Sequence, residues 1–129
     1  MRYNRDNALC YAREHALCTS IYESGTDADA TAFVSRCIAA GAGIDFECGD
    51  PDLLCQTLKE KLSARECEPE ELQVGDIVQI RMGDGLPYKS LIVTGRDGSD
   101  VLVSAHSYIS LDRPLDSYRF SDIRCFCLG

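Results

Sequence analysis

The hydrophobic pattern of this chain changes its period once, near Leu72, and that change limits the folds the chain can adopt. Before Leu72, apolar residues recur at the three- and four-residue spacing of helices. After it, they alternate with polar residues as they do in strands. Helices followed by antiparallel strands are typical of the α+β class. The sequence therefore predicts N-terminal helices packed on an antiparallel sheet of four to six strands.

Three helices are predicted in the first half. The first covers about 5–18, and the second covers about 30–40. Asp29 is expected to cap the second helix, because its carboxylate can accept backbone N–H bonds there. Gly41 is expected to end the second helix, because glycine readily adopts the left-handed conformation of a helix stop. The third helix should begin at Pro51, since the first helical position needs no N–H donor.

The second half contains the strand signals. Alternating or β-branched segments are separated by turn residues such as those in "RDGSD". The charged segment before Leu72 is expected to be a solvated connection. Strands are predicted at 75–82, 88–95, 101–107 and 123–128, with a short further one within 112–120.

Length and composition fit one domain with a packed core. The chain has 129 residues, of which 45% are hydrophobic and 26% are charged. No repeat or linker divides it, so residues 1–129 are predicted to form a single domain. Its helical half covers about 1–66 and its sheet half about 70–129.

The chain is acidic, with a formal net charge of −8 and a sequence pI of about 4.6. A nucleic-acid-binding surface needs a basic stripe, and the sequence has none, so no nucleic-acid partner is expected. No apolar run approaches the roughly 20 residues of a membrane span, so no membrane insertion is expected. The N-terminus lacks the apolar core of a signal peptide, which predicts a cytoplasmic protein. If the chain is a domain cut from a longer secreted protein, secretion stays an alternative.

The eight cysteines allow a disulfide framework or a reduced core. Without an export signal, and with enough chain for a core, we predict reduced and mostly buried thiols. Zinc knuckles usually show closely paired ligands, and no C-x-x-C pair is present, so neither a metal nor a cofactor is expected. The cysteines are Cys10, Cys18, Cys37, Cys48, Cys55, Cys67, Cys125 and Cys127.

Five segments in order carry the pattern of a known family. Together they resemble the bacterial amidase domain family that is related to papain-like cell-wall cysteine amidases and peptidases. No single segment is specific, but the order and spacing match over nearly the whole chain. The resemblance implies a papain-like fold, whereas activity has to be argued from the site. The segments are "YNRDNALCYAREHAL" at 3–17, "DATAFVSRCIAAGA" at 29–42, "LQVGDIVQI" at 72–80, "YKSLIVTG" at 88–95 and "VSAHSYISLDRPL" at 103–115.

The resemblance also indicates where a catalytic site would lie. A papain-like amidase needs a thiolate at a helix start and a histidine base. The nucleophile position falls on Ala30 and the base position on Lys89, while the family's second histidine survives as His106. Alanine cannot attack a carbonyl, and a lysine with the ordinary pKa of about 10.4 is protonated at neutral pH. These three are therefore vestigial positions, and no catalytic set is intact. The residues expected to line the cleft are Asp29, Thr31, Ala32 and Ser90.

Three interpretations follow. The first is a catalytically inactive amidase-like domain that binds a peptide, a cell-wall fragment or a protein in the vestigial cleft. The second is an active cysteine amidase or peptidase whose cysteine was deliberately replaced by Ala30. The third is a small acidic interaction protein that uses the fold as a scaffold. Changes at Ala30, Ala32 and Lys89 together favour natural loss over deliberate replacement.

One other cysteine is a conceivable nucleophile. Cys37 follows Ala30 by seven residues, so it lies about 10 Å further along the helix. That distance excludes the same base and oxyanion site, and we expect Cys37 in the core. An open groove at the start of the second helix would favour the first interpretation, and a filled one the third.

Overall fold

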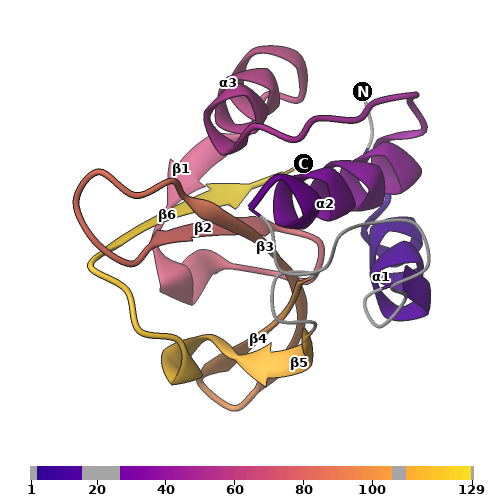
Figure 1. Ribbon diagram of the computed structural model, residues 1–129. Coiled ribbons are helices and arrows are strands. Elements are labelled where there is room, and N and C mark those ends of the chain that lie inside the picture. Colours follow the sequence, from indigo (N-terminus) through magenta and orange to yellow (C-terminus); the bar gives the residue numbers. More distant parts are fainter. Residues whose placement is uncertain (1–2, 16–26, 106–109, 129) are drawn as a thin grey trace.

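A computed structural model describes residues 3–15, 27–105 and 110–128, and confirms the α+β class. Three helices pack against one six-stranded antiparallel sheet. The middle helix lies between the other two and contacts the sheet mainly through β3 (Figure 1). The helices are α1 (Arg5–His15), α2 (Asp27–Ala42) and α3 (Pro51–Lys61).

The strands follow the order β1-β6-β2-β3-β4-β5, and every neighbouring pair is antiparallel. The last strand in the chain, β6, therefore lies inside the sheet, between β1 and β2. Two short 3-10 helices, Pro69–Glu71 (η1) and Leu115–Ser117 (η2), connect strands. The strands are β1 (Arg65–Cys67), β2 (Ile77–Arg81), β3 (Lys89–Asp97), β4 (Asp100–Ala105), β5 (Ser110–Pro114) and β6 (Asp122–Cys127).

The predicted strands are found, with ends shifted by a few residues. The segment 112–120 divides between the end of β5 and η2, and residues 106–107 of the predicted third strand lie outside the described residues. The prediction missed β1, which it placed in a solvated connection at the end of the helical half. This strand has only three residues and no apolar alternation of its own, and its register with β6 defines it. Pairing with a distant segment thus overrides the local pattern.

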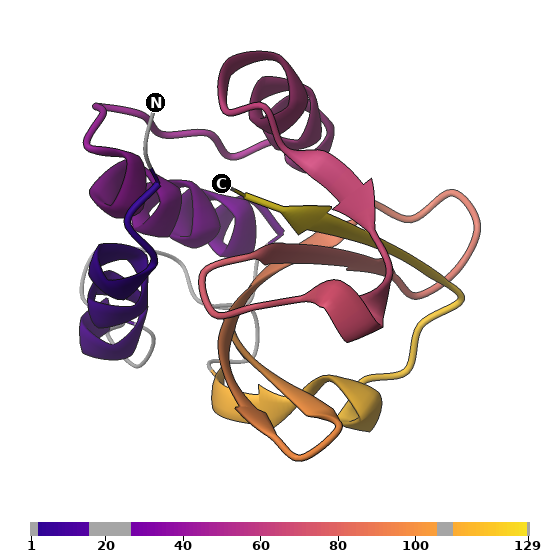
Figure 2. The same ribbon diagram turned by 180° about the vertical axis from the view of Figure 1, so that it is seen from behind.

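Each face of the sheet carries its own core, because neighbouring residues along a strand point to opposite faces. On β2, Ile77 faces the helices and packs in a cluster with Phe33 of α2, while Val78 belongs to the cluster on the other face. The pairing of β3 with β4 shifts register between Val93 and Gly95. Such irregularities bend a sheet, and Figure 2 shows β4 and β5 turned away from β1, β6 and β2.

The carboxylate of Asp76 joins the start of the chain to its end. Asp76 is fully buried, and its Oδ1 accepts a 2.7 Å hydrogen bond from Arg5 and a 2.9 Å bond from the backbone N–H of Leu128. Arg5 also donates to the Leu128 carbonyl. Beside this contact, the Tyr3 hydroxyl donates to the Gly75 carbonyl at 2.7 Å. The residues around the start of α1 and those just before β2 are therefore in direct contact.

The prediction that Gly41 ends α2 is wrong. The helix continues to Ala42, and the left-handed residue is Gly43, with φ of 70°. Gly41 has a different role, because a Cβ there would lie 2.5 Å from the Tyr3 ring and 2.9 Å from the Asn4 carbonyl oxygen. The missing side chain lets the start of α1 lie against the end of α2.

The start of α2 also differs from the prediction. The helix begins at Asp27, so Asp29 lies within its first turn and is not the residue that precedes it. Acidic residues in a first turn are favourable there because of the helix dipole. For α3 the prediction is confirmed: Pro51 is at the first position, and the Asp50 carboxylate accepts a 2.9 Å bond from the Asp52 N–H.

Replacing Arg5 tests the Asp76 contact. Arg5→Ala should lower the free energy of unfolding by about 3 kcal/mol, because it leaves a buried carboxylate without its cation. Lys59→Ala is the matched control, since Lys59 and Glu66 form an exposed ion pair at 2.7 Å that should contribute at most about 1 kcal/mol. Urea denaturation followed by circular dichroism measures both. Equal losses for the two variants would contradict the role given to Asp76.

A glycine pair tests the packing of α1 on α2. Gly41→Ala should lower the free energy of unfolding by about 2 kcal/mol, because its methyl group would overlap the Tyr3 ring. Gly43→Ala should lower it by about 1 kcal/mol, because only the backbone is strained and no other atom lies within 4 Å of the added Cβ. Denaturation midpoints compare the two. A Gly41→Ala protein as stable as the original would rule out the close contact.

Candidate functional site

The first turns of α2 meet the beginning of β3. The hydroxyl oxygens of Thr31 and Ser90 lie 3.0 Å apart, and both side chains are fully buried. Ala30 and Lys89 immediately precede these two residues, so the predicted nucleophile and base positions lie on the two segments that this hydrogen bond joins. Lys89 pairs with Ile80, which packs on the face opposite the helices, so strand alternation turns Lys89 away from α2 and the two predicted positions do not face each other. Ala30 is fully buried and Lys89 is 9% exposed. His106 and the side chain of Asp29 lie outside the described residues.

The sequence of β3 explains why a serine lies at this junction. Strand alternation turns Ser90 and Ile92 toward the helices and Leu91 toward the other face. Accordingly, Ile92 packs in the same cluster as Phe33, and Leu91 packs in the opposite one. A small polar side chain at the start of β3 allows α2 to approach the sheet closely and gives Thr31 a partner.

A chain of hydrogen bonds runs from this junction to the protein surface. The Gln79 amide donates to the Ser90 hydroxyl at 3.0 Å, and its oxygen accepts a 2.5 Å bond from Arg124. Arg124 in turn donates to the Asp52 carboxylate at 2.9 Å. The Tyr88 ring centre lies 3.7 Å from the Arg124 guanidinium carbon, which is a cation–π distance. Polar groups that link α2, α3 and the sheet therefore occupy this region.

The other candidate nucleophiles, Cys37 and Ser35, have structural roles. Cys37 is fully buried, and burial raises its pKa well above the ordinary value, which disfavours the reactive thiolate. The Ser35 hydroxyl donates to the Ala32 carbonyl at 2.7 Å and accepts from the Cys48 N–H at 3.0 Å. The prediction that Cys37 belongs to the core is confirmed. Ala32, predicted to line a cleft, is half-buried.

Sequence analysis missed the members of the network beyond Ser90. A signal for Gln79 was available, since it is an amide between two buried aliphatic residues, Val78 and Ile80. A buried amide needs partners, which points to a polar contact on that face. The partner Arg124 could not be found this way, because it lies opposite Gln79 only through the pairing of β2 with β6.

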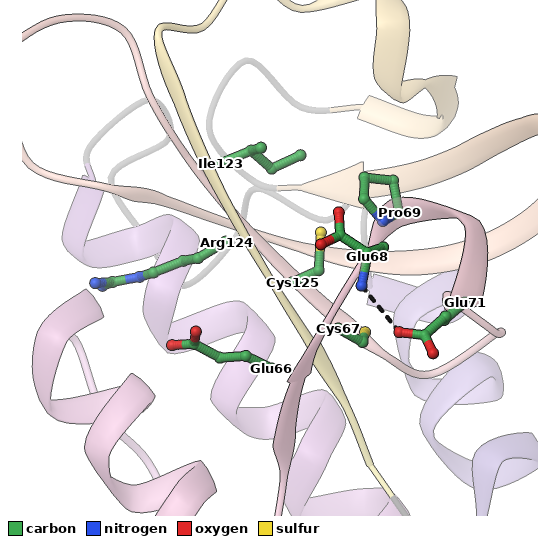
Figure 3. Close-up of a pocket in the computed structure, with 8 residues that line it drawn as sticks. All are labelled: Glu66, Cys67, Glu68, Pro69, Glu71, Ile123, Arg124 and Cys125. Atoms are coloured by element: carbon green, nitrogen blue, oxygen red, sulfur yellow. Dashed lines mark hydrogen bonds between the residues drawn. The ribbon is translucent and has the colours of Figure 1, made fainter.

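Two surface hollows lie away from the α2–β3 junction. The first, of about 370 Å³, is enclosed by β1, η1 and β6, and is lined by Glu66, Glu68, Glu71 and Cys67 among others (Figure 3). The second, of about 420 Å³, lies between α1, α2 and the segment 44–47. Neither hollow is lined by Ala30 or Lys89.

The described cysteines are free thiols in a range of environments. Most of them are buried, as predicted, but Cys10 on α1 is exposed, and Cys18 lies outside the described residues. Burial raises the pKa of the Cys125 thiol to about 12. The pKa of Cys67 is also raised, first by burial and then by a hydrogen bond with Cys127. Within residues 3–15, 27–105 and 110–128, no cluster of three or more histidine, cysteine or acidic side chains is suited to a metal ion.

Comparison with protein-family models, with curated proteins and with solved structures finds no match for this chain. In the part of the chain that the structure describes, no helix combines the length and the hydrophobicity needed to cross a membrane. The residues themselves therefore carry the functional argument.

Replacing Gln79 tests whether the network holds the junction together. Gln79→Leu should lower the free energy of unfolding by about 2–3 kcal/mol, because it deprives buried groups, including the Pro51 carbonyl, of a partner. Thr31→Val removes one bond at the inner end and should cost about 1 kcal/mol. Chemical denaturation measures both variants. If Gln79→Leu were neutral, the network would have no part in stability.

Proposed function

We propose that this chain is an interaction protein that uses an amidase-like fold, without catalysis, as a scaffold for binding a peptide or protein, which is the third interpretation above. The observation that carries the proposal is the filled junction between α2 and β3. At the positions where a related enzyme would need a thiolate and an imidazole, the chain has Ala30 and Lys89. The adjoining hydroxyls of Thr31 and Ser90 are bonded to each other and are closed off from solvent.

The chemistry of the junction supports an inactive domain. Amide hydrolysis needs a nucleophile with a nearby group that can take its proton. The Ser90 hydroxyl has as its partners the hydroxyl of Thr31 and the amide of Gln79. Neither a hydroxyl nor an amide accepts a proton at neutral pH. Ser90 therefore serves as a packing and hydrogen-bonding residue.

The outer surface supports a macromolecular partner over a small enclosed substrate. The loop between β2 and β3 projects from the sheet (Figure 1). It carries Met82 and Leu86, which are 43% and 53% exposed. Large exposed apolar side chains on a projecting loop can be buried by a partner protein or peptide. This matches a scaffold whose former catalytic junction is filled.

The proposal predicts no turnover. The purified protein, incubated with muropeptides and with synthetic stem peptides, should leave every amide bond intact by liquid chromatography and mass spectrometry. Ala30→Cys should also be inactive, because Lys89 cannot serve as the base that histidine provides. Turnover by the unaltered protein that disappears in His106→Ala would overturn the proposal. Turnover by Ala30→Cys alone would favour the interpretation of an active enzyme whose cysteine was replaced.

The same samples distinguish the classes of ligand. A muropeptide that raises the melting temperature without being cleaved identifies a cell-wall fragment as the ligand, because binding to the folded state stabilises it. Leu86→Ser is the matched surface variant, and its own stability should change by less than about 0.5 kcal/mol. If a peptide ligand binds through the β2–β3 loop, its affinity should fall in Leu86→Ser and stay unchanged in Thr31→Val.

A further inference from the structure

Three cysteines gather at the β1 edge of the sheet, in a region that the proposed function does not use. The register of β1 with β6 places Cys67 directly opposite Cys125. Cys127 follows two residues later on β6 and therefore falls on the same face. Cys67 and Cys125 line the hollow beside η1, where Figure 3 draws them on neighbouring strands.

The pairing geometry selects one of the two cysteine pairs. Directly opposed residues of antiparallel strands have Cα atoms about 4.5–5.5 Å apart, which lies within the range of about 4.4–6.8 Å found for disulfides. Diagonal neighbours are about 7–8 Å apart, beyond what a disulfide spans without backbone movement. Cys67 and Cys125 are therefore placed to form a disulfide, whereas Cys127 is a hydrogen-bonding neighbour of Cys67.

The two thiols differ in access. Cys67 is half-buried at the hollow, whereas Cys125 is 3% exposed beneath it. A small reagent thus reaches the Cys67 sulfur first, and the Cys125 sulfur can react with whatever forms on Cys67. An accessible thiol with a second thiol opposite it suits stepwise exchange with an external disulfide.

We propose that Cys67 and Cys125 form a reversible disulfide between β1 and β6 by exchange with a low-molecular-weight disulfide. In the first step the thiolate of Cys67, a small fraction of that thiol at neutral pH because burial raises its pKa, attacks the external disulfide. This forms a mixed disulfide and releases one thiolate, which takes up the proton that Cys67 lost. In the second step the Cys125 thiolate attacks the Cys67 sulfur and releases the second small thiol. Two protein thiols are oxidised, and one external disulfide is reduced to two thiols.

The disulfide would change the edge of the sheet. In the thiol form, β1 is attached to β6 through only three register pairs. A covalent bond between them closes the chain from Cys67 to Cys125, a loop that contains most of the sheet. Closing a loop of this length restricts the unfolded chain, so the oxidised protein should be the more stable form.

The experiment uses the whole chain and the neutral probe 2-hydroxyethyl disulfide. After exchange, trypsin digestion without reductant should yield peptide 66–81 joined to peptide 125–129, and dithiothreitol should separate them. The melting temperature should rise by about 5–15 °C on oxidation. Cys67→Ser and Cys125→Ala should abolish both effects. The matched controls Cys127→Ser and Cys10→Ser, the latter at an exposed thiol on α1, should retain them.

Two outcomes would overturn the inference. One is a hydroxyethyl adduct that persists on Cys67 in the unaltered protein without any joined peptide. The other is a joined peptide that persists in Cys125→Ala, which would show that Cys125 is not the partner. Cys67 is only half-buried, so Cys67→Ser should fold. If Cys125→Ala proves unstable, the loss of the joined peptide in Cys67→Ser still tests the inference. Neither outcome depends on amide hydrolysis or on ligand binding by the proposed module.

Discussion

The buried carboxylate of Asp76 is the contact on which the relation between the two halves of the molecule depends. The carboxylate accepts hydrogen bonds from Arg5 at the start of α1 and from the Leu128 N–H after β6. The backbone carbonyl of Asp76 accepts a 2.9 Å bond from the Val93 N–H on β3. One residue thereby fixes the first helix, the last strand and the centre of the sheet. A charge without solvent is stable only when it is fully paired, so each of these segments is held in place by the others.

The same principle explains why the α2–β3 junction is solvent-excluded. Hydrogen bonds link Ser90 to Thr31 and to Gln79. Arg124 extends this network by donating to Gln79 and to Asp52 at the start of α3. A catalytic junction has to pair its nucleophile with a basic group and leave the nucleophile accessible to substrate. Here the hydrogen-bonding capacity is used to hold helices against the sheet. The polar groups of this junction therefore serve the stability of the fold.

The parts of the fold that local chemistry determines were predictable from the sequence. Helix period, strand alternation and the Asp50–Pro51 start of α3 all act within a few residues of chain. The remaining features depend on contacts between distant segments. Gly41 and Gly43 look alike in sequence, and only the position of the Tyr3 ring gives them different roles. Likewise β1 is defined by β6, and Gln79 meets Arg124 only because β2 and β6 are paired.

The strand order has a consequence for how the chain can be assembled during synthesis. The strand β6 leaves the ribosome after every other strand, yet it lies between β1 and β2. Until it emerges, the hairpins from β2 to β5 can form by local pairing, while β1 and the helix before it have no strand to join. Nascent chains should therefore expose an open strand edge on β2 until β6 has emerged, and this is the stage at which chaperones would protect that edge.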